Sequence, residues 1–206
     1  FYADLWGLRK KKYNYLFEND LQTTKWQELE PVDPYYFFVP KDFALQVEYE
    51  KFWKVTDIFT EWTEGVKTHR DHFVVGYTKE EIIQRLRIFT GKLPDEMVKG
   101  SLKLKDTRDW NLSEARQRAS FELLQKEITK YAYRVFDNRS VCYSSNLIEF
   151  DRSIIMKHFL GKENVGLSLT RRLRDPTWKH VFVTSLITDK TLVSSKDNCC
   201  FFPLYL

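Results

Sequence analysis

The nine-residue stretch GVKTHRDHF, residues 65–73, places a glycine, two cations, a carboxylate, two histidines and a hydroxyl immediately before an apolar run. Two histidines and a carboxylate can ligate zinc or iron, but a convincing site needs a third ligand at a recognisable spacing. The remaining two histidines belong to no such pattern. A metal site at His69, Asp71 and His72 is therefore the weaker alternative, and we expect no bound metal.

Self-sufficient catalytic motifs are missing from the sequence. No Gly-x-Ser-x-Gly elbow is present, and the cysteines have no neighbouring base that would activate a thiolate. The glycine-rich phosphate loops GxGxxG and GxxxxGK[ST] are absent as well. We therefore expect no catalytic residue and no cofactor site within these 206 residues.

Cations and a small hydroxyl gather in the loop that precedes the apolar run. Lys67 and Thr68 suit phosphate oxygens, and Arg70 can bind a phosphate or read guanine with two hydrogen bonds. Asp71 is predicted to orient Arg70 through a bidentate pair. The pattern indicates a loop that grips a polyanion, although an internal arginine–carboxylate brace is an equal alternative.

A second loop of the same chemistry occurs in the stretch YRVFDNR. Asp137 is predicted to orient either Arg134 or Arg139, and both arginines are candidates for DNA contact. Here too the alternative is an internal brace. The sequence alone leaves the two interpretations open.

Three cations in four residues form a third cluster. They repel one another and are seldom buried, which predicts a solvated or anion-facing loop. The net charge of the whole chain is only +4, which permits nucleic-acid binding without requiring it. The members of this cluster are Arg171, Arg172 and Arg174.

The composition is that of a globular protein with an unusual aromatic content of 16%. No apolar run is long enough for a membrane span, and the start carries no signal-peptide pattern. Three cysteines, two of them adjacent, give neither a disulfide framework nor a metal knuckle. We expect a cytoplasmic protein.

The periodicity mixes helices and strands without regular alternation, which predicts an α+β fold, a mixed sheet with flanking helices. A Thr-x-x-Glu capping box at residues 78–81 predicts the start of the clearest helix, and an aspartate at position 42 is a second candidate cap. The predicted helices are 1–18, a segment from 43 onward, 80–89, 113–124 and 153–160. The predicted strands are 35–39, 73–77, 131–136, 140–143, 165–169 and 180–187, with a turn at 137–139 and a solvated turn at 94–96.

The order of these motifs resembles the C-terminal specificity region of type ISP restriction-modification enzymes and related adenine-N6 DNA methyltransferases. The resemblance spans nearly the whole chain, and one departure is Val135, where the family usually has proline. The matching pieces are YADLWGLR, PYYFFVP, GVKTHRD, DW at 109–110, YRVFDNR, MKH at 156–158, NVGL at 164–167 and the terminal FPLY.

This resemblance implies one target-recognition domain over residues 1–206, cut from a longer polypeptide, with residues 1–60 as an arm on an absent methyltransferase core. It implies that the longer enzyme binds S-adenosylmethionine and methylates adenine, and that some members also carry a motor and a nuclease. The module itself would bind double-stranded DNA and help present a flipped adenine. The alternatives are a coupling module without base readout and, third, a metal-dependent hydrolase.

Overall fold

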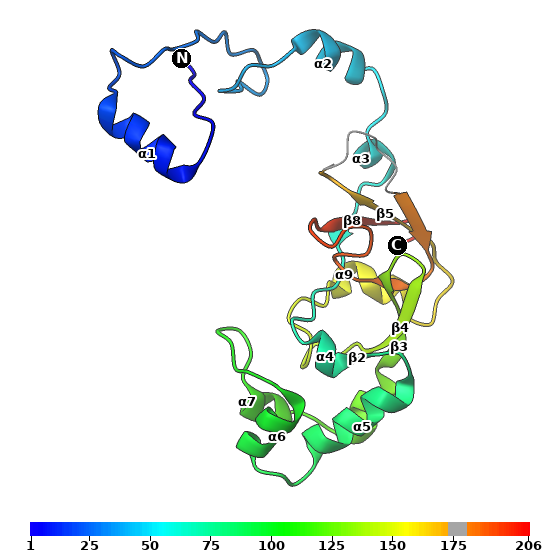
Figure 1. The fold of residues 1–206 in the computed structure, drawn as a ribbon. Coiled ribbons are helices and arrows are strands. Elements are labelled where there is room, and N and C mark those ends of the chain that lie inside the picture. The colour runs from blue at the N-terminus through cyan, green and yellow to red at the C-terminus, as the bar shows by residue number, and fades with distance from the viewer. Residues whose placement is uncertain (173–180) are drawn as a thin grey trace. The chain divides into compact units, whose positions relative to one another are not determined.

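The computed structural model describes residues 1–172 and 181–206, and its contacts divide the chain into two compact units (Figure 1). The first unit comprises Phe1–Lys54 and the second Val55–Leu206. Helices and sheets are both present in the second unit, which confirms the predicted α+β class. No helix among the described residues has the length and apolar character needed to cross a membrane.

The first unit contains two helices and no buried residue. Helix α1 spans Arg9–Glu18 and α2 spans Phe43–Tyr49, where the Asp42 carboxylate accepts a hydrogen bond of 3.0 Å from the Ala44 amide as predicted. The strand predicted for residues 35–39 was wrong, because this apolar run forms turns and bends and lies largely exposed. Within this unit no described strand offers it a partner, so its backbone has no ladder to join.

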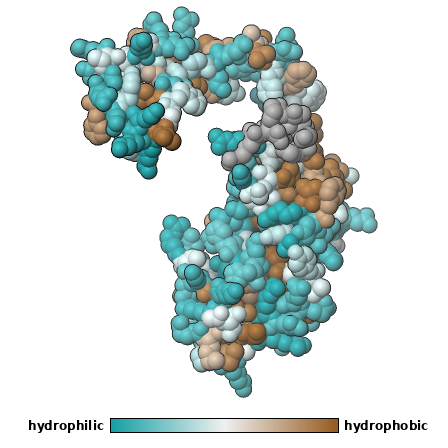
Figure 2. Space-filling view, viewed as in Figure 1, coloured by the Kyte–Doolittle hydropathy of each residue, from teal (hydrophilic) through white to brown (hydrophobic). Residues whose placement is uncertain are grey.

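One of two four-stranded sheets in the second unit is antiparallel throughout, in the order β1-β8-β5-β6. Every residue of β8 is buried, and Phe201 on this strand packs against Phe159 with ring centroids 4.9 Å apart. Figure 2 shows apolar residues at the surface over β6, where Val181 and Val183 are exposed. The strand bounds are β1 Thr63–Glu64, β5 Gly166–Thr170, β6 Val181–Thr184 and β8 Cys199–Pro203. The helices that precede these strands in the chain are α3 Val55–Ile58, α9 Ser153–Met156 and η1 Lys157–Phe159.

The other sheet is mixed, in the order β2-β4-β3-β7, because β7 joins β3 in parallel. Its β3–β4 hairpin confirms the two strands predicted around YRVFDNR. The main apolar core lies where this sheet meets the helices α4 to α8. The bounds are β2 Val75–Gly76, β3 Ile128–Arg134, β4 Asp137–Cys142, β7 Ile187–Thr188, α4 Asp71–Val74, α5 Lys79–Thr90, α6 Asp95–Leu102, α7 Leu112–Gln117 and α8 Phe121–Lys126.

Helix α5 begins as its capping box predicts. The Thr78 hydroxyl accepts a hydrogen bond of 3.3 Å from the Glu81 amide, and the Glu81 carboxylate accepts one of 3.2 Å from the Tyr77 amide. The acidic residues of the first turn also interact favourably with the positive end of the helix dipole. The buried face consists of Ile82, Leu86 and Phe89, spaced at three and four residues.

Local hydrogen bonds overturn four details of the predicted elements. The first two residues of the strand predicted for 73–77 belong instead to helix α4, because the amides at 73 and 74 bond back to the carbonyl of Arg70. The predicted helix 113–124 is two helices, since the Ser120 hydroxyl accepts a bond from the Leu123 amide and starts a new one. The hairpin turn lies at Val135–Phe136 instead of 137–139, beside an irregularity in the strand pairing. Residues 95–102 form α6 where a solvated turn was predicted.

Residues 65–67 connect the two sheets and require a glycine to do so. The Val66 amide donates to the Thr188 carbonyl at 2.7 Å, and the Lys190 amide donates to the Val66 carbonyl at 3.0 Å. A Cβ atom placed on Gly65 would lie 2.4 Å from the backbone carbonyl group of Asp189. The Asp189 backbone cannot move away from such a Cβ atom without breaking the neighbouring hydrogen bonds between Val66 and residues 188 and 190.

We therefore expect Gly65→Ala to destabilise the protein by about 2 kcal/mol, the scale of overpacking at a site without room. Urea unfolding followed by circular dichroism measures this. Gly100→Ala is the matched control, because its Cβ meets nothing within 4 Å and it lies in α6, where alanine is the better helix former. Equal stability of the two variants would show that the crossing tolerates a side chain.

Candidate nucleic-acid interface

The two motifs singled out in the sequence contact each other through Asp71. One oxygen of this carboxylate accepts a hydrogen bond from the Thr68 hydroxyl, and the other accepts one of 3.0 Å from the Tyr133 hydroxyl on β3. Burial, reinforced by the neighbouring Asp71, raises the pKa of Tyr133, so this phenol keeps its proton and remains a donor. The loop at residues 65–71 and the β3–β4 hairpin are thus joined into one structure.

Two guanidinium groups lie against the same tyrosine ring. The central carbons of the Arg134 and Arg139 guanidiniums are each 4.0 Å from the centroid of the Tyr133 ring. Arg139 also lies 4.3 Å from the centroid of the Tyr77 ring. Cations over aromatic faces are stabilised by the ring quadrupole, with about 0.5–2 kcal/mol for each such contact. We call these four side chains the Tyr133 stack.

Carboxylates hold both guanidiniums of the stack in place. Arg139 donates from Nε and Nη2 to Asp137 over 2.7–3.0 Å, and this pairing lowers the pKa of Asp137. Asp137 therefore orients Arg139, one of the two partners predicted for it. Arg134 donates from Nη1 to Asp189 at 2.8 Å. Asp189 is 4% exposed and also accepts a hydrogen bond of 2.8 Å from Tyr131.

The stack leaves donor groups of both arginines facing solvent. The side chains of Arg134 and Arg139 are 33% and 21% exposed. Within the described part of the chain, nothing accepts a hydrogen bond from Arg134 Nη2 or from Arg139 Nη1. The guanidiniums are fixed by the protein on one side and remain available to an anion on the other.

Arg70 lies elsewhere, in the interior of the second unit. It is 3% exposed, it donates from Nε to the Leu147 carbonyl at 3.0 Å, and its guanidinium lies 4.2 Å from the Trp110 ring centroid. The predicted pair between Asp71 and Arg70 is not formed. The carboxylate nearest to Arg70 is Glu149, 3.8 Å from Nη1. Burial lowers the pKa of Arg70, and the nearby Glu149 opposes that effect.

Glu149 also binds His69, the most strained residue of the loop. His69 Nδ1 lies 2.6 Å from a Glu149 oxygen, and the residue has a left-handed φ of 57°. The backbone turns there because Arg70 points inward while His69 remains exposed. Arg70, Glu149 and His69 together form an internal brace, which is the alternative that the sequence left open for this loop.

The other predicted cations lie at or near the surface. Lys67 is half-buried, with its ammonium 5.0 Å from the Phe150 ring centroid, and Thr68 is buried beneath it as a partner of Asp71. Arg171 and Arg172 are exposed immediately after β5. Arg174 lies outside the described residues.

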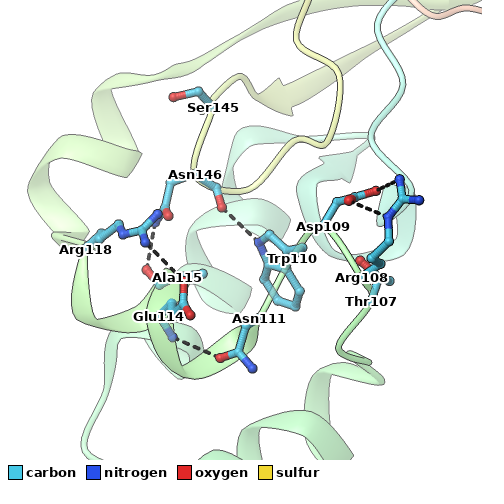
Figure 3. Close-up of a pocket in the computed structure, with 10 residues that line it drawn as sticks. All are labelled: Thr107, Arg108, Asp109, Trp110, Asn111, Glu114, Ala115, Arg118, Ser145 and Asn146. Carbon is cyan, nitrogen blue, oxygen red and sulfur yellow. Dashed lines mark hydrogen bonds and ion pairs between the residues drawn. The ribbon is translucent and has the colours of Figure 1, made fainter.

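A polar hollow of about 260 Å³ is lined in part by Trp110 (Figure 3). The guanidinium of Arg70 contacts the ring of the same Trp110. The side chains of the hollow already bind one another: Arg108 pairs with Asp109, Arg118 pairs with Glu114, and Trp110 donates to the Asn146 carbonyl at 2.9 Å. This arrangement anchors helix α7 and one face of the Trp110 ring. Its polar groups serve the fold, and we assign no ligand to it.

Metal ligation finds no support in the described residues, which contain no group of three or more histidine, cysteine or carboxylate side chains able to hold an ion. His72 Nε2 instead lies 3.2 Å from the Lys103 carbonyl, away from the Glu149 contact of His69. The two histidines of GVKTHRDHF therefore have separate surroundings.

Sequence reasoning missed three members of this region. Tyr133 belongs to the YRVFDNR motif and Tyr77 ends the predicted strand 73–77, but neither position indicates a stacking role. Asp189 lies 55 residues after its partner Arg134, a separation at which a pattern in the sequence gives no indication of contact. Alternation along β3 was the one available signal, since it places Tyr131 and Tyr133 on one face of the sheet.

We expect Arg70→Ala to lower the free energy of unfolding by about 3 kcal/mol, because it leaves the buried Glu149 without its guanidinium and removes the stack on Trp110. Urea unfolding measures the loss. The matched control is Arg108→Ala, whose side chain is 90% exposed and whose removal should change stability by less than about 0.5 kcal/mol. A stability loss as small as the control's would refute the brace.

The comparisons with known proteins concern the same region. The Type ISP C-terminal specificity domain family matches residues 57–206. No curated protein matches the chain. Solved structures that share its fold include three complexes with DNA or a DNA mimic. The DrdV–DNA complex, seen by cryo-electron microscopy, has a TM-score of 0.59 at 22% identity over 95% of this chain and 21% of that one.

The other two structures are type ISP restriction-modification enzymes. A nuclease-deletion mutant of LlaGI in complex with a DNA substrate mimic has a TM-score of 0.55 at 16% identity, over 95% of this chain and 20% of that one. ATP-dependent LlaBIII bound to DNA has a TM-score of 0.51 at 18% identity, over 71% of this chain and 10% of that one. The present chain thus spans about a fifth or less of their lengths. The match over residues 57–206 covers most of the sequence, and the chain belongs to the type ISP C-terminal specificity domain family.

Proposed function

We propose that this chain recognises a DNA target for a restriction-modification enzyme of the adenine-N6 methyltransferase type. It would bind duplex DNA and help present the target adenine to a catalytic domain of the same polypeptide. The Tyr133 stack carries this proposal, because it holds two guanidiniums in fixed orientations with donors left over. Membership of the specificity-domain family and the shared fold with enzymes bound to DNA support it.

The chemistry of the stack suits a nucleic acid better than a small anion. A fixed guanidinium fork can bind a phosphate through two hydrogen bonds or read the O6 and N7 atoms of guanine. Arg134 and Arg139 both lie 4.0 Å from the centroid of one ring, so they present two fixed cations close together. Among the described residues, each keeps an unpaired terminal nitrogen, Nη2 of Arg134 and Nη1 of Arg139, for a phosphate oxygen or a base edge. Lys67, Arg171 and Arg172 then supply further cations for phosphate contacts along the duplex.

The sequence motifs favour separate recognition and catalytic domains within a longer polypeptide. This chain has no motif for catalysis, so the methyl donor S-adenosylmethionine and the methyl-transfer residues would belong to the neighbouring domain. The specificity module would hold the duplex in register while an unstacked adenine enters that neighbour's pocket.

The first unit favours a second, coupling role for residues 1–54. None of its residues is buried, although it carries large apolar side chains such as Trp6, Phe17 and Trp53 at 82–89% exposure. An apolar hollow of about 370 Å³ is lined by Leu5, Leu16 and other residues of this unit. Exposed apolar surface of this kind marks a protein–protein contact, and we propose the methyltransferase domain of the same polypeptide as its partner.

Titration of the 206-residue chain with a fluorescent duplex pool across salt concentrations tests the proposal. We expect saturable binding. The logarithm of the association constant should fall with the logarithm of the salt concentration, with a slope of about 0.9 for each phosphate neutralised. Selection of the bound duplexes then yields the target sequence. Absence of binding at low salt would overturn direct recognition by this chain and favour the coupling role.

Arg139→Ala should weaken binding to the selected duplex about tenfold, the cost of one lost hydrogen bond from a charged group, and should reduce the salt dependence if that contact is to phosphate. Asp137→Asn is the matched control, because it loosens the same guanidinium without removing its charge. We expect the control to keep the salt dependence. If both variants bind as the wild type does while both lose stability, Arg139 is only a brace of the hairpin.

A further inference from the structure

Phe136 occupies the tip of the β3–β4 hairpin in a conformation that phenylalanine rarely adopts. Its φ is 61°, in the left-handed region, where glycine and asparagine are the favoured residues. Its side chain is nevertheless 92% exposed, among the most exposed apolar residues of the chain. Neither the backbone position nor the burial of apolar surface accounts for a phenylalanine here, and such departures concentrate at functional sites.

The tip that carries this ring is anchored by a short turn, a backbone hydrogen bond and two neighbouring ion pairs. Only Val135 and Phe136 connect the two strands, since Arg134 is already paired with Asp137 in the ladder. The Val135 amide donates to the Leu192 carbonyl at 3.2 Å. On either side of the connection, the two guanidiniums of the Tyr133 stack are fixed by their carboxylates.

One neighbour contacts the ring without covering it. Phe182 on β6 contacts Phe136 edge to face, with centroids 5.9 Å apart and an interplanar angle of 86°. A T-shaped contact of this kind is a preferred aromatic geometry. It uses one side of one ring, and the exposed fraction shows that the rest of Phe136 stays open to a partner.

We propose that Phe136 inserts between neighbouring base pairs of the bound duplex and stacks on a partly unstacked base. This inference rests on the proposed DNA recognition and adds the residue that deforms the target. Apolar side chains that wedge into a base step unstack it at a cost, which the additional contacts to the bent duplex offset. Aromatic rings stack on any base, because every base has a π-face.

The hydrogen-bond donors that the described residues leave unpaired around the tip favour a nucleic acid over a protein as the partner. A base step is flanked by phosphates on both strands, and the ring of Phe136 is flanked in sequence by the part-exposed guanidiniums of Arg134 and Arg139. Asn138, also exposed beside the tip, can donate and accept hydrogen bonds at a base edge. An apolar pocket of a protein would match the ring alone and would leave these polar groups without partners.

The experiment uses the 206-residue chain and the duplex selected by the wild type, with 2-aminopurine substituted at one position at a time. We expect the wild type to raise 2-aminopurine fluorescence at one base step, which reports unstacking there. Phe136→Gly should abolish that signal and weaken binding about tenfold or more, consistent with the loss of one base–aromatic stack. Phe136→Trp, which keeps an aromatic ring, should retain both the signal and the affinity.

Phe136→Gly also separates insertion from misfolding, because glycine suits the left-handed backbone and should leave the unfolding temperature unchanged or higher. Wild-type affinity and an unchanged fluorescence profile in this variant would overturn the insertion while leaving DNA recognition intact. Unchanged DNA binding together with weaker association with a separately supplied methyltransferase domain would overturn it in favour of a protein contact. A wild type that binds no duplex would overturn the proposed function and the insertion together.

Discussion

The hydrogen bond between Tyr133 and Asp71 is the contact on which the arrangement of this region depends. It fixes the ring of Tyr133, and two guanidiniums of like charge lie against that ring. The carboxylates of Asp189 and Asp137 pair with Arg134 and Arg139 and offset the repulsion between the two cations. The same bond joins the loop at residues 65–71 to the β3–β4 hairpin, so the orientation of the hairpin follows from the position of the loop.

Burial divides the arginines of the candidate interface into two kinds. Arg70 is enclosed by Trp110, Leu147 and Glu149, and its desolvated charge contributes to the packing of the second unit. Arg134 and Arg139 are fixed by carboxylates yet keep part of their donors in water. A guanidinium serves both purposes well, because its planar fork can stack on a ring while its edge forms hydrogen bonds. The residue type alone therefore does not distinguish a brace from a binding group.

The two units of the chain are stabilised in different ways. The second unit has a continuous apolar core between its mixed sheet and the helices α4 to α8, and it contains the segment that matches the specificity-domain family. The first unit, residues 1–54, buries none of its side chains and has two helices without an apolar layer to cover them. Most helical stability in proteins comes from packing of an apolar face, and the helices of this unit have no such packing within the unit itself.

Local patterns determined the parts of this protein that local forces control. The α+β class, the capped start of α5, the Asp42 cap and the β3–β4 hairpin follow from periodicity and from short-range hydrogen bonds. The motifs around positions 70 and 134–139 contain residues that the tertiary structure joins through Asp71 and Tyr133. Only the tertiary structure decided that Arg70 is buried, that Glu149 is its nearest carboxylate, and that Asp71 binds Tyr133 instead. Long-range contacts of this region join residues that are 55 positions apart in Arg134–Asp189 and 80 positions apart in His69–Glu149. Burial and long-range pairing are properties of the packed chain, so the spacing of residues along the sequence does not contain them.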